Sequence, residues 1–110
     1  MTPLHPRGVL MNLEFSAAKS AATLAVPGSG TVVARIDFRE DEHGVFLDYL
    51  WTNPMFRGQG YARQMLNAFA EFVRSSGKGI TPLCGVARAM MQGDPRYDDL
   101  LPQNFGESPG

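Results

Sequence analysis

A glycine-rich segment between a strand-like run and an amphipathic run limits the fold of this chain more than any other feature. The segment is Arg57–Ala62, with the sequence RGQGYA. Gly58 and Gly60 permit backbone dihedral angles that other residues rarely adopt. A helix that begins after such a turn offers backbone N–H groups without intrahelical partners, together with the positive end of its dipole. The pattern predicts an anion-binding turn, or else a tight turn whose glycines serve geometry alone.

Upstream of this turn are four runs that either alternate apolar and polar residues or are rich in β-branched and aromatic residues, which is typical of strands. They are Asn12–Ser16, Ala21–Val26, Thr31–Phe38 and Val45–Thr52. Two polar segments that contain glycine, Pro27–Gly30 and Arg39–Gly44, predict turns between them. We therefore expect an antiparallel meander of about four strands, with Val45–Thr52 as its central strand.

Downstream of the turn, Gly60–Ser75 predicts the longest helix, because its apolar residues recur at steps of three and four. Gly77 follows as a plausible C-terminal stop. A short strand, Gly79–Cys84, and a short helix, Val86–Met91, are expected after it. The predicted fold is a mixed α/β (α+β) layer, in which one long helix packs on the meander and a short strand–helix tail follows.

Length and charge bound the remaining possibilities. The 110 residues suit one domain, which we place at residues 12–101 between flexible tails at 1–11 and 102–110. Met11 is an alternative start, because the patterned sequence begins just after it. The formal net charge of −1 gives no electrostatic reason to expect nucleic acid or a membrane as partner. No apolar run approaches the roughly 20 residues of a spanning helix, so a cytoplasmic location is expected.

Cys84 is the only cysteine, so no intrachain disulfide forms. It has no ligand-like spacing with His5 or His43, and we expect no metal site. His43 lies in a polar turn, where a solvated side chain is expected. Cys84 lies between a predicted strand and a predicted helix, where a thiol can act as an acyl-accepting nucleophile. The alternative is a small buried apolar residue.

Two motifs together resemble the GCN5-related N-acetyltransferase superfamily. Thr52–Ala62 is similar to its acetyl-CoA motif, in which a strand ends in a hydrophobic-x-Pro step and Arg-Gly-x-Gly-x-Ala follows. Thr81–Ala87 and Asp94–Tyr97 resemble a minimal subgroup about as short as this chain, which shares a Pro-Leu-Cys step and a later His-Pro-x-Tyr. The resemblance covers roughly Asn12–Leu101.

Two positions depart from that subgroup. Tyr49 and Leu50 stand where it usually has a His-Thr pair, and Asp94 stands where it has the histidine of His-Pro. Each change removes a proton-transfer group. The departures bear on catalysis more than on cofactor binding.

The resemblance implies a minimal fold of this type, with acetyl-CoA or CoA as cofactor and an unidentified amine, small molecule or peptide, as acceptor. The pantetheine arm would pair with main-chain atoms of the strand that ends at Thr52, and the diphosphate would lie on the glycine turn. The implied cofactor-binding residues are Leu50, Trp51, Thr52, Arg57, Gly58, Gln59, Gly60, Tyr61, Ala62 and Arg63. Taken alone, Trp51 and Tyr49 read as ordinary packing aromatics.

Direct acyl transfer in that superfamily needs a base for the amine and an acid for the departing thiolate. Candidate acids are Tyr97, Tyr49 and Cys84, and candidate bases are Asp48 and Glu42. Cys84 and Tyr97 are the predicted catalytic residues. With this resemblance, Cys84 is alternatively expected to line the pantetheine end beside the sulfur of the cofactor, or to form a mixed disulfide with free CoA. An N-acetyltransferase is the leading hypothesis, a non-catalytic module that binds CoA or acyl-CoA is the second, and a structural or interaction domain is the third. The sequence is compatible with a monomer or a homodimer.

Overall fold

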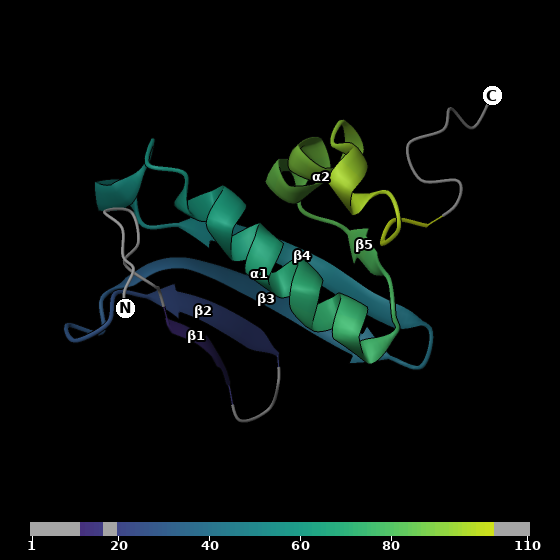
Figure 1. Cartoon of the computed structure of the whole chain (residues 1–110), viewed down its shortest axis with the longest axis horizontal. Helices are drawn as coiled ribbons and strands as arrows, with labels where there is room; N and C mark the ends of the chain where they lie inside the picture. Colours follow the sequence, from purple (N-terminus) through teal and green to yellow (C-terminus); the bar gives the residue numbers. More distant parts are fainter. Residues whose placement is uncertain (1–11, 17–19, 103–110) are drawn as a thin grey trace, which may run out of the picture.

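In the computed structural model, residues 12–16 and 20–102 are described, and they form a five-stranded sheet with two α-helices packed on it (Figure 1). The strands are β1 (Asn12–Phe15), β2 (Ala21–Ala25), β3 (Val32–Asp41), β4 (Gly44–Thr52) and β5 (Ile80–Pro82). The helices are α1 (Tyr61–Ser76) and α2 (Gly85–Gln92), with short 3-10 turns η2 (Pro54–Phe56) and η3 (Pro95–Tyr97). Strands β1 to β4 pair in chain order as an antiparallel meander, and β5 joins β4 in parallel. The predicted mixed α/β fold is confirmed.

Two details of the predicted meander are wrong. Arg39–Gly44 is not a turn throughout, because β3 continues to Asp41 and only Glu42 and His43 separate it from β4. The carboxylate of Asp41 accepts the N–H groups of His43 and Gly44 at 2.7 and 3.1 Å, which holds this tight hairpin. The middle strand of the sheet is β3, whereas β4 lies next to it. The predicted tail 1–11, with Met11, and residues 103–110 of the C-terminal tail lie outside the described residues.

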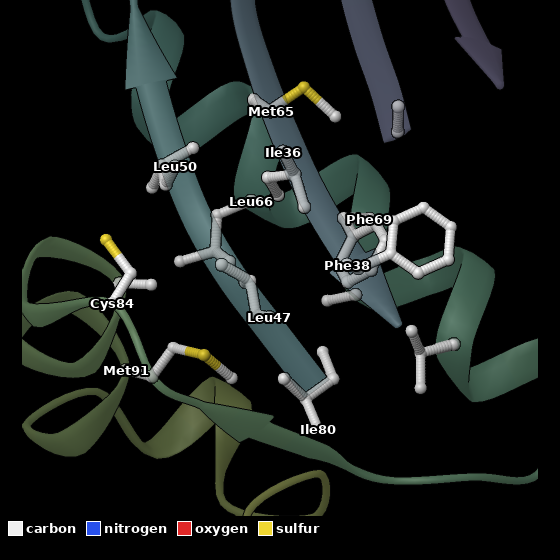
Figure 2. Packing of buried hydrophobic residues seen from close by; sticks show 14 of the residues in the cluster. Ile36, Phe38, Leu47, Leu50, Met65, Leu66, Phe69, Ile80, Cys84 and Met91 are labelled. Atoms are coloured by element: carbon white, nitrogen blue, oxygen red, sulfur yellow. The ribbon is translucent and has the colours of Figure 1, made fainter. Parts of the chain in front are cut away.

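The hydrophobic core lies between α1 and one face of the sheet (Figure 2). Helix α1 buries Met65, Leu66, Phe69, Ala70 and Val73, which recur at the spacing of one helical face. The alternating residues Ile36 and Phe38 of β3 meet them, and the rings of Phe38 and Phe69 are 5.0 Å apart. Burial of each large side chain stabilises the fold by about 1.5–3 kcal/mol. Helix α2 adds Ala87 and Met91 to the same core, so both helices lie on one face of the sheet.

Strand β4 changes its hydrogen-bonding partners part-way along its length. It pairs with β5 only over Val45–Leu47. On its other edge Leu47 pairs with Phe38 and Tyr49 with Asp37, so Asp48 is the unmatched residue of a β-bulge. A bulge bends its strand and increases the local twist. On the edge that faces β5, no strand of the described chain pairs with β4 from Asp48 to Thr52.

Gly79 supplies the first testable consequence of this packing. A Cβ atom there would lie 2.7 Å from the carbonyl oxygen of Leu100, which itself accepts the N–H of Ile80. We expect Gly79→Ala to lower the free energy of unfolding by about 1–3 kcal/mol, the usual cost of an overpacked contact. In the control Gly85→Ala, the new Cβ meets nothing within 4 Å at the start of α2. The control should be neutral or stabilising by up to about 1 kcal/mol. Urea unfolding measures both, and equal midpoints would contradict the close approach.

Candidate functional site

A cleft of about 430 Å³ lies where β4 has lost its second partner. Its walls come from the end of β4, the glycine turn, the first turn of α1 and the start of α2. The lining residues are Tyr49, Leu50, Trp51, Thr52, Phe56, Arg57, Gly58, Gly60, Tyr61, Ala62 and Val86. All the predicted cofactor-binding residues except Gln59 and Arg63 belong to this lining. The volume lies in the range of pockets that hold small molecules and cofactors.

Local hydrogen bonds fix the chain between β4 and α1. The side chain of Asn53 donates to the carbonyl of Val32 at 3.0 Å and accepts the N–H of Met55 at 3.0 Å. Gly58 and Gly60 then take φ angles of 81° and 83°, in the left-handed region that favours glycine. A Cβ atom on either glycine would meet nothing within 4 Å. Backbone conformation therefore requires these glycines, and the space beside them is open.

The start of α1 presents hydrogen-bond donors to the cleft. Gly60 is the N-cap, and within the described structure no side chain caps this end and no acidic residue occupies the first turn. The first backbone N–H groups of a helix have no intrahelical acceptor, and the helix dipole adds positive potential there. Arg57 is exposed on the same wall. This corner of the cleft is suited to an anion with several oxygen atoms.

The free edge of β4 presents a second set of main-chain groups. Asn53 N–H donates to the carbonyl of Val33 at 2.9 Å. Because antiparallel strands alternate hydrogen-bonded and non-hydrogen-bonded pairs, the main chain of Trp51 faces β3, and that of Leu50 and Thr52 faces the cleft. Leu50 and Thr52 are thus placed to pair with an extended ligand. Trp51 lines the cleft but does not turn its main-chain groups towards it.

Comparison with known proteins agrees with this geometry. The family model described as GCN5-related N-acetyl-transferase matches residues 22–100. The chain belongs to the GCN5-related N-acetyltransferase family. The solution structure of a GCN5-like protein from Staphylococcus aureus has a similar fold, with a TM-score of 0.63 and 21% identity over 88% of this chain and 98% of that one. No curated protein matches the chain significantly.

Arg63 of this acetyltransferase-family chain does not line the cleft, although it lies in the first turn of α1. Its guanidinium donates to the carboxylate of Asp94 and the hydroxyl of Tyr97, each at 3.1 Å, and to the carbonyl of Met90 at 3.5 Å. These contacts turn its charge towards α2 and η3. Gln59 is exposed and also lies outside the lining. The position of neither side chain supports its predicted contact with cofactor.

Tyr97, a predicted catalytic residue, is 1% exposed and lies away from the cleft lining. Its hydroxyl donates to the side-chain oxygen of Asn67 and accepts from Arg63. Asp94 completes this network, which ties α1 to the C-terminal segment. The backbone N–H of Arg96 and the nearby Arg96 and Arg63 guanidinium groups lower the pKa of Asp94. This position thus carries a structural ion pair in place of a proton-transfer group.

Cys84, the other predicted catalytic residue, is 8% exposed and belongs to the core cluster (Figure 2). It is the N-cap of α2, and its carbonyl accepts the N–H of Arg88 at 2.8 Å. The thiol does not line the cleft, although Val86 two residues later does. This placement favours the packing interpretation of Cys84.

The predicted bases are also poorly placed. Both carboxylate oxygens of Asp48 accept from Arg39 at 2.8 Å, and this hydrogen bonding lowers the pKa of Asp48. Glu42 lies in the hairpin before β4, seven residues from Tyr49 and therefore roughly 20 Å away along an extended strand. Tyr49, a further candidate acid, does line the cleft and is 51% exposed.

Phe56 and Val86 are lining residues that the sequence interpretation missed. Phe56 could have been identified, because it lies within the Thr52–Ala62 motif, next to the glycine turn, and its ring packs 5.9 Å from that of Tyr61. No local feature of the sequence predicts Val86, because α2 is brought to the cleft by tertiary packing. In residues 12–16 and 20–102, no group of three His, Cys, Asp or Glu side chains is arranged to hold a metal ion. No helix in the same ranges is long and apolar enough to cross a membrane.

The Asp94 network makes a prediction about pH. An aspartate whose pKa is lowered in the folded state stabilises it above its unfolded pKa, and this stabilisation disappears as the pH falls through the folded value. We expect Asp94→Asn to unfold at lower urea concentration than the parent at pH 5–7. The difference should begin to shrink as the pH falls below about 3.9, the unfolded value, and should vanish below the lower pKa of the folded state. Asp98→Asn, on the same turn but exposed, is the matched control and should change little. A difference for Asp94→Asn that persists undiminished at pH 2–3 would contradict the ion-pair role.

The burial of Cys84 makes a second prediction. Iodoacetamide should alkylate it at least about tenfold more slowly in the native protein than in urea, because reaction then requires opening of the core. Cys84→Ala should lower stability by about 1 kcal/mol and change the Kd for CoA less than twofold. Intact mass against time follows the alkylation. Fast native alkylation that saturating CoA blocks would instead place the thiol beside the cofactor.

Proposed function

We propose that this protein is an N-acetyltransferase that uses acetyl-CoA and acetylates an amine, and that the cleft between β4, α1 and α2 holds the coenzyme. The observation that carries the proposal is one continuous cleft with two complementary ends. One end is an uncapped helix start next to Arg57, and the other is an unpaired stretch of strand edge. Membership of the family supports this assignment.

The residues present fit the coenzyme. A diphosphate needs several hydrogen-bond donors and positive charge, which the amides of Gly58–Ala62 and the Arg57 side chain offer. The pantetheine arm contains amides, and such a ligand binds well to a strand edge with free main-chain groups. Leu50 and Thr52 supply these groups on β4.

Acetyl-CoA supplies a thioester, from which the acetyl group passes to the amine as the C–N bond forms, the C–S bond breaks and the proton lost from nitrogen balances the CoA thiolate. The chain contributes position and surroundings. The β4 edge orients the coenzyme, and the apolar side chains of Leu50, Phe56 and Val86 limit the access of water. We assign proton donation to Tyr49, whose hydroxyl-bearing side chain lines the cleft near the bulge. Cys84 and Tyr97 support the walls from within the core.

A non-catalytic CoA-binding module is the second candidate, and one observation favours it. The carboxylate at the bulge, Asp48, is held by Arg39 with a lowered pKa and is therefore a weak base. Such a site would bind the coenzyme through the same residues without turning it over.

The CoA placement is testable by calorimetric titration. We expect Gly60→Val to weaken CoA binding at least about tenfold, because a β-branched residue disfavours the left-handed conformation and fills the space beside the turn. Gly77→Val is the matched control. Gly77 has the same left-handed conformation, with φ 78°, but lies at the far end of α1, about 24 Å away. The control should lose stability and still bind CoA. Equal weakening by both variants, measured below their unfolding temperatures, would overturn the placement.

Arg57→Ala in the same titration should weaken binding about tenfold and reduce its salt dependence, because one charge-assisted contact is lost.

Release of free thiol from acetyl-CoA with a panel of amines then separates the two candidate functions. Tight CoA binding without thiol release from any amine would favour the binding module.

A further inference from the structure

Three exposed apolar side chains lie at or next to the cleft, on elements other than the phosphate turn. Tyr49 and Val86 are 51% and 54% exposed, and both line the cleft. Leu83 is 47% exposed, and its N–H donates to the carbonyl of Leu47 at 2.9 Å, which places it beside the bulge. We call these three residues the acceptor mouth. They come from β4, the β5–α2 connection and α2. Tyr49 and Val86 share the cleft lining, and Leu83 lies outside that lining, beside the bulge.

The carboxylates near the acceptor mouth already have cationic partners. Asp48 is the bulge residue next to Tyr49 and is held by two 2.8 Å bonds from Arg39. Asp37, directly opposite Tyr49 in the sheet, accepts from Arg35 at 2.8 Å. These two Asp and two Arg side chains sum to zero charge. A cationic ligand that entered the acceptor mouth would therefore meet carboxylates that are already neutralised.

We infer that the acceptor is a small amine with an apolar aryl or alkyl body and no second charge, and that Leu83 and Val86 hold this body beside Tyr49. The inference rests on the proposed acetyl transfer. An ammonium group that leaves water for this mouth loses hydration, and the described part of the chain offers it no unpaired carboxylate there, so the neutral and nucleophilic form of the amine is favoured. A second ammonium, as in a diamine or a lysine-rich peptide, would take the place of an apolar group against Leu83 and Val86, so that this contact is lost and no unpaired carboxylate of the described chain replaces it.

The matched pair hexylamine and 1,6-diaminohexane tests the inference, because the two differ by one terminal ammonium. With saturating acetyl-CoA, thiol release should give a kcat/KM at least tenfold higher for hexylamine. Leu83→Gln should lower kcat/KM for hexylamine at least fivefold, mainly through KM, without a change in CoA affinity. Met55→Gln replaces an apolar residue that is 84% exposed and lies in η2, on none of the elements of the acceptor mouth, and it should leave the rate unchanged.

A second variant tests the charge argument directly. Arg39→Gln leaves Asp48 as an unpaired carboxylate at the mouth, and it should raise the diamine-to-monoamine ratio of kcat/KM at least fivefold. The control Lys78→Gln breaks the exposed Lys78–Glu40 ion pair at the other end of the sheet and should leave the ratio unchanged.

The outcomes separate this inference from the proposed function. If CoA binds but neither amine, nor a lysine-rich peptide, releases thiol, the proposed activity fails and the inference fails with it. If amines are acetylated but 1,6-diaminohexane or the peptide is used as well as hexylamine, the activity stands and the inference is overturned. Unchanged kinetics in Leu83→Gln would likewise remove the acceptor mouth from the site.

Discussion

Hydrogen bonding along the two edges of β4 determines where this molecule can bind a ligand. From Val45 to Leu47 both edges are paired, with β3 on one side and β5 on the other. At Asp48 the bulge bends the strand, and β5 ends at Pro82, which has no N–H to donate. The chain then leaves the sheet and enters α2. Unpaired strand edges usually invite aggregation, and here the exposed stretch is short and lies inside a cleft.

The other half of the cleft depends on the position of α1. Its buried face fixes the helix across β3 and β4, and this brings Gly60 and Tyr61 next to the end of β4. The C-terminal segment braces the helix from the side through the contacts of Arg63 with Asp94 and Tyr97. Arg63, which the sequence predicts to be a cofactor ligand, is therefore part of the support of the helix that offers the proposed phosphate site.

Local patterns in the sequence were sufficient to predict the meander, the long helix and the glycine turn. Each depends on the periodicity of apolar residues or on a left-handed glycine, and both are properties of neighbouring residues. The bulge at Asp48 could not be predicted, because it appears only when β3 and β4 are placed in register. The partners of Arg63 are Asp94 and Tyr97, 31 and 34 positions away, and no local pattern specifies them. The sequence could not decide between a site role and a packing role for Cys84 for the same reason. The start of a short helix has the same sequence pattern whether the residue before it faces a cleft or the core.

The weakness of the candidate bases and the character of the acceptor mouth fit one chemical scheme. Acetyl transfer requires an amine with a free lone pair, so either the protein removes a proton or the amine arrives neutral. Asp48 is unsuited to the first route, because Arg39 stabilises its ionised form. An apolar mouth serves the second route, since desolvation lowers the pKa of an ammonium group. The Arg39–Asp48 ion pair then has two effects. It makes Asp48 too weak a base to deprotonate the amine, and it neutralises the carboxylate that would otherwise bind a charged amine. If the proposed acetyl transfer holds, a chain of this architecture would gain selectivity for neutral amines at the expense of rate at low pH, where such amines are scarce.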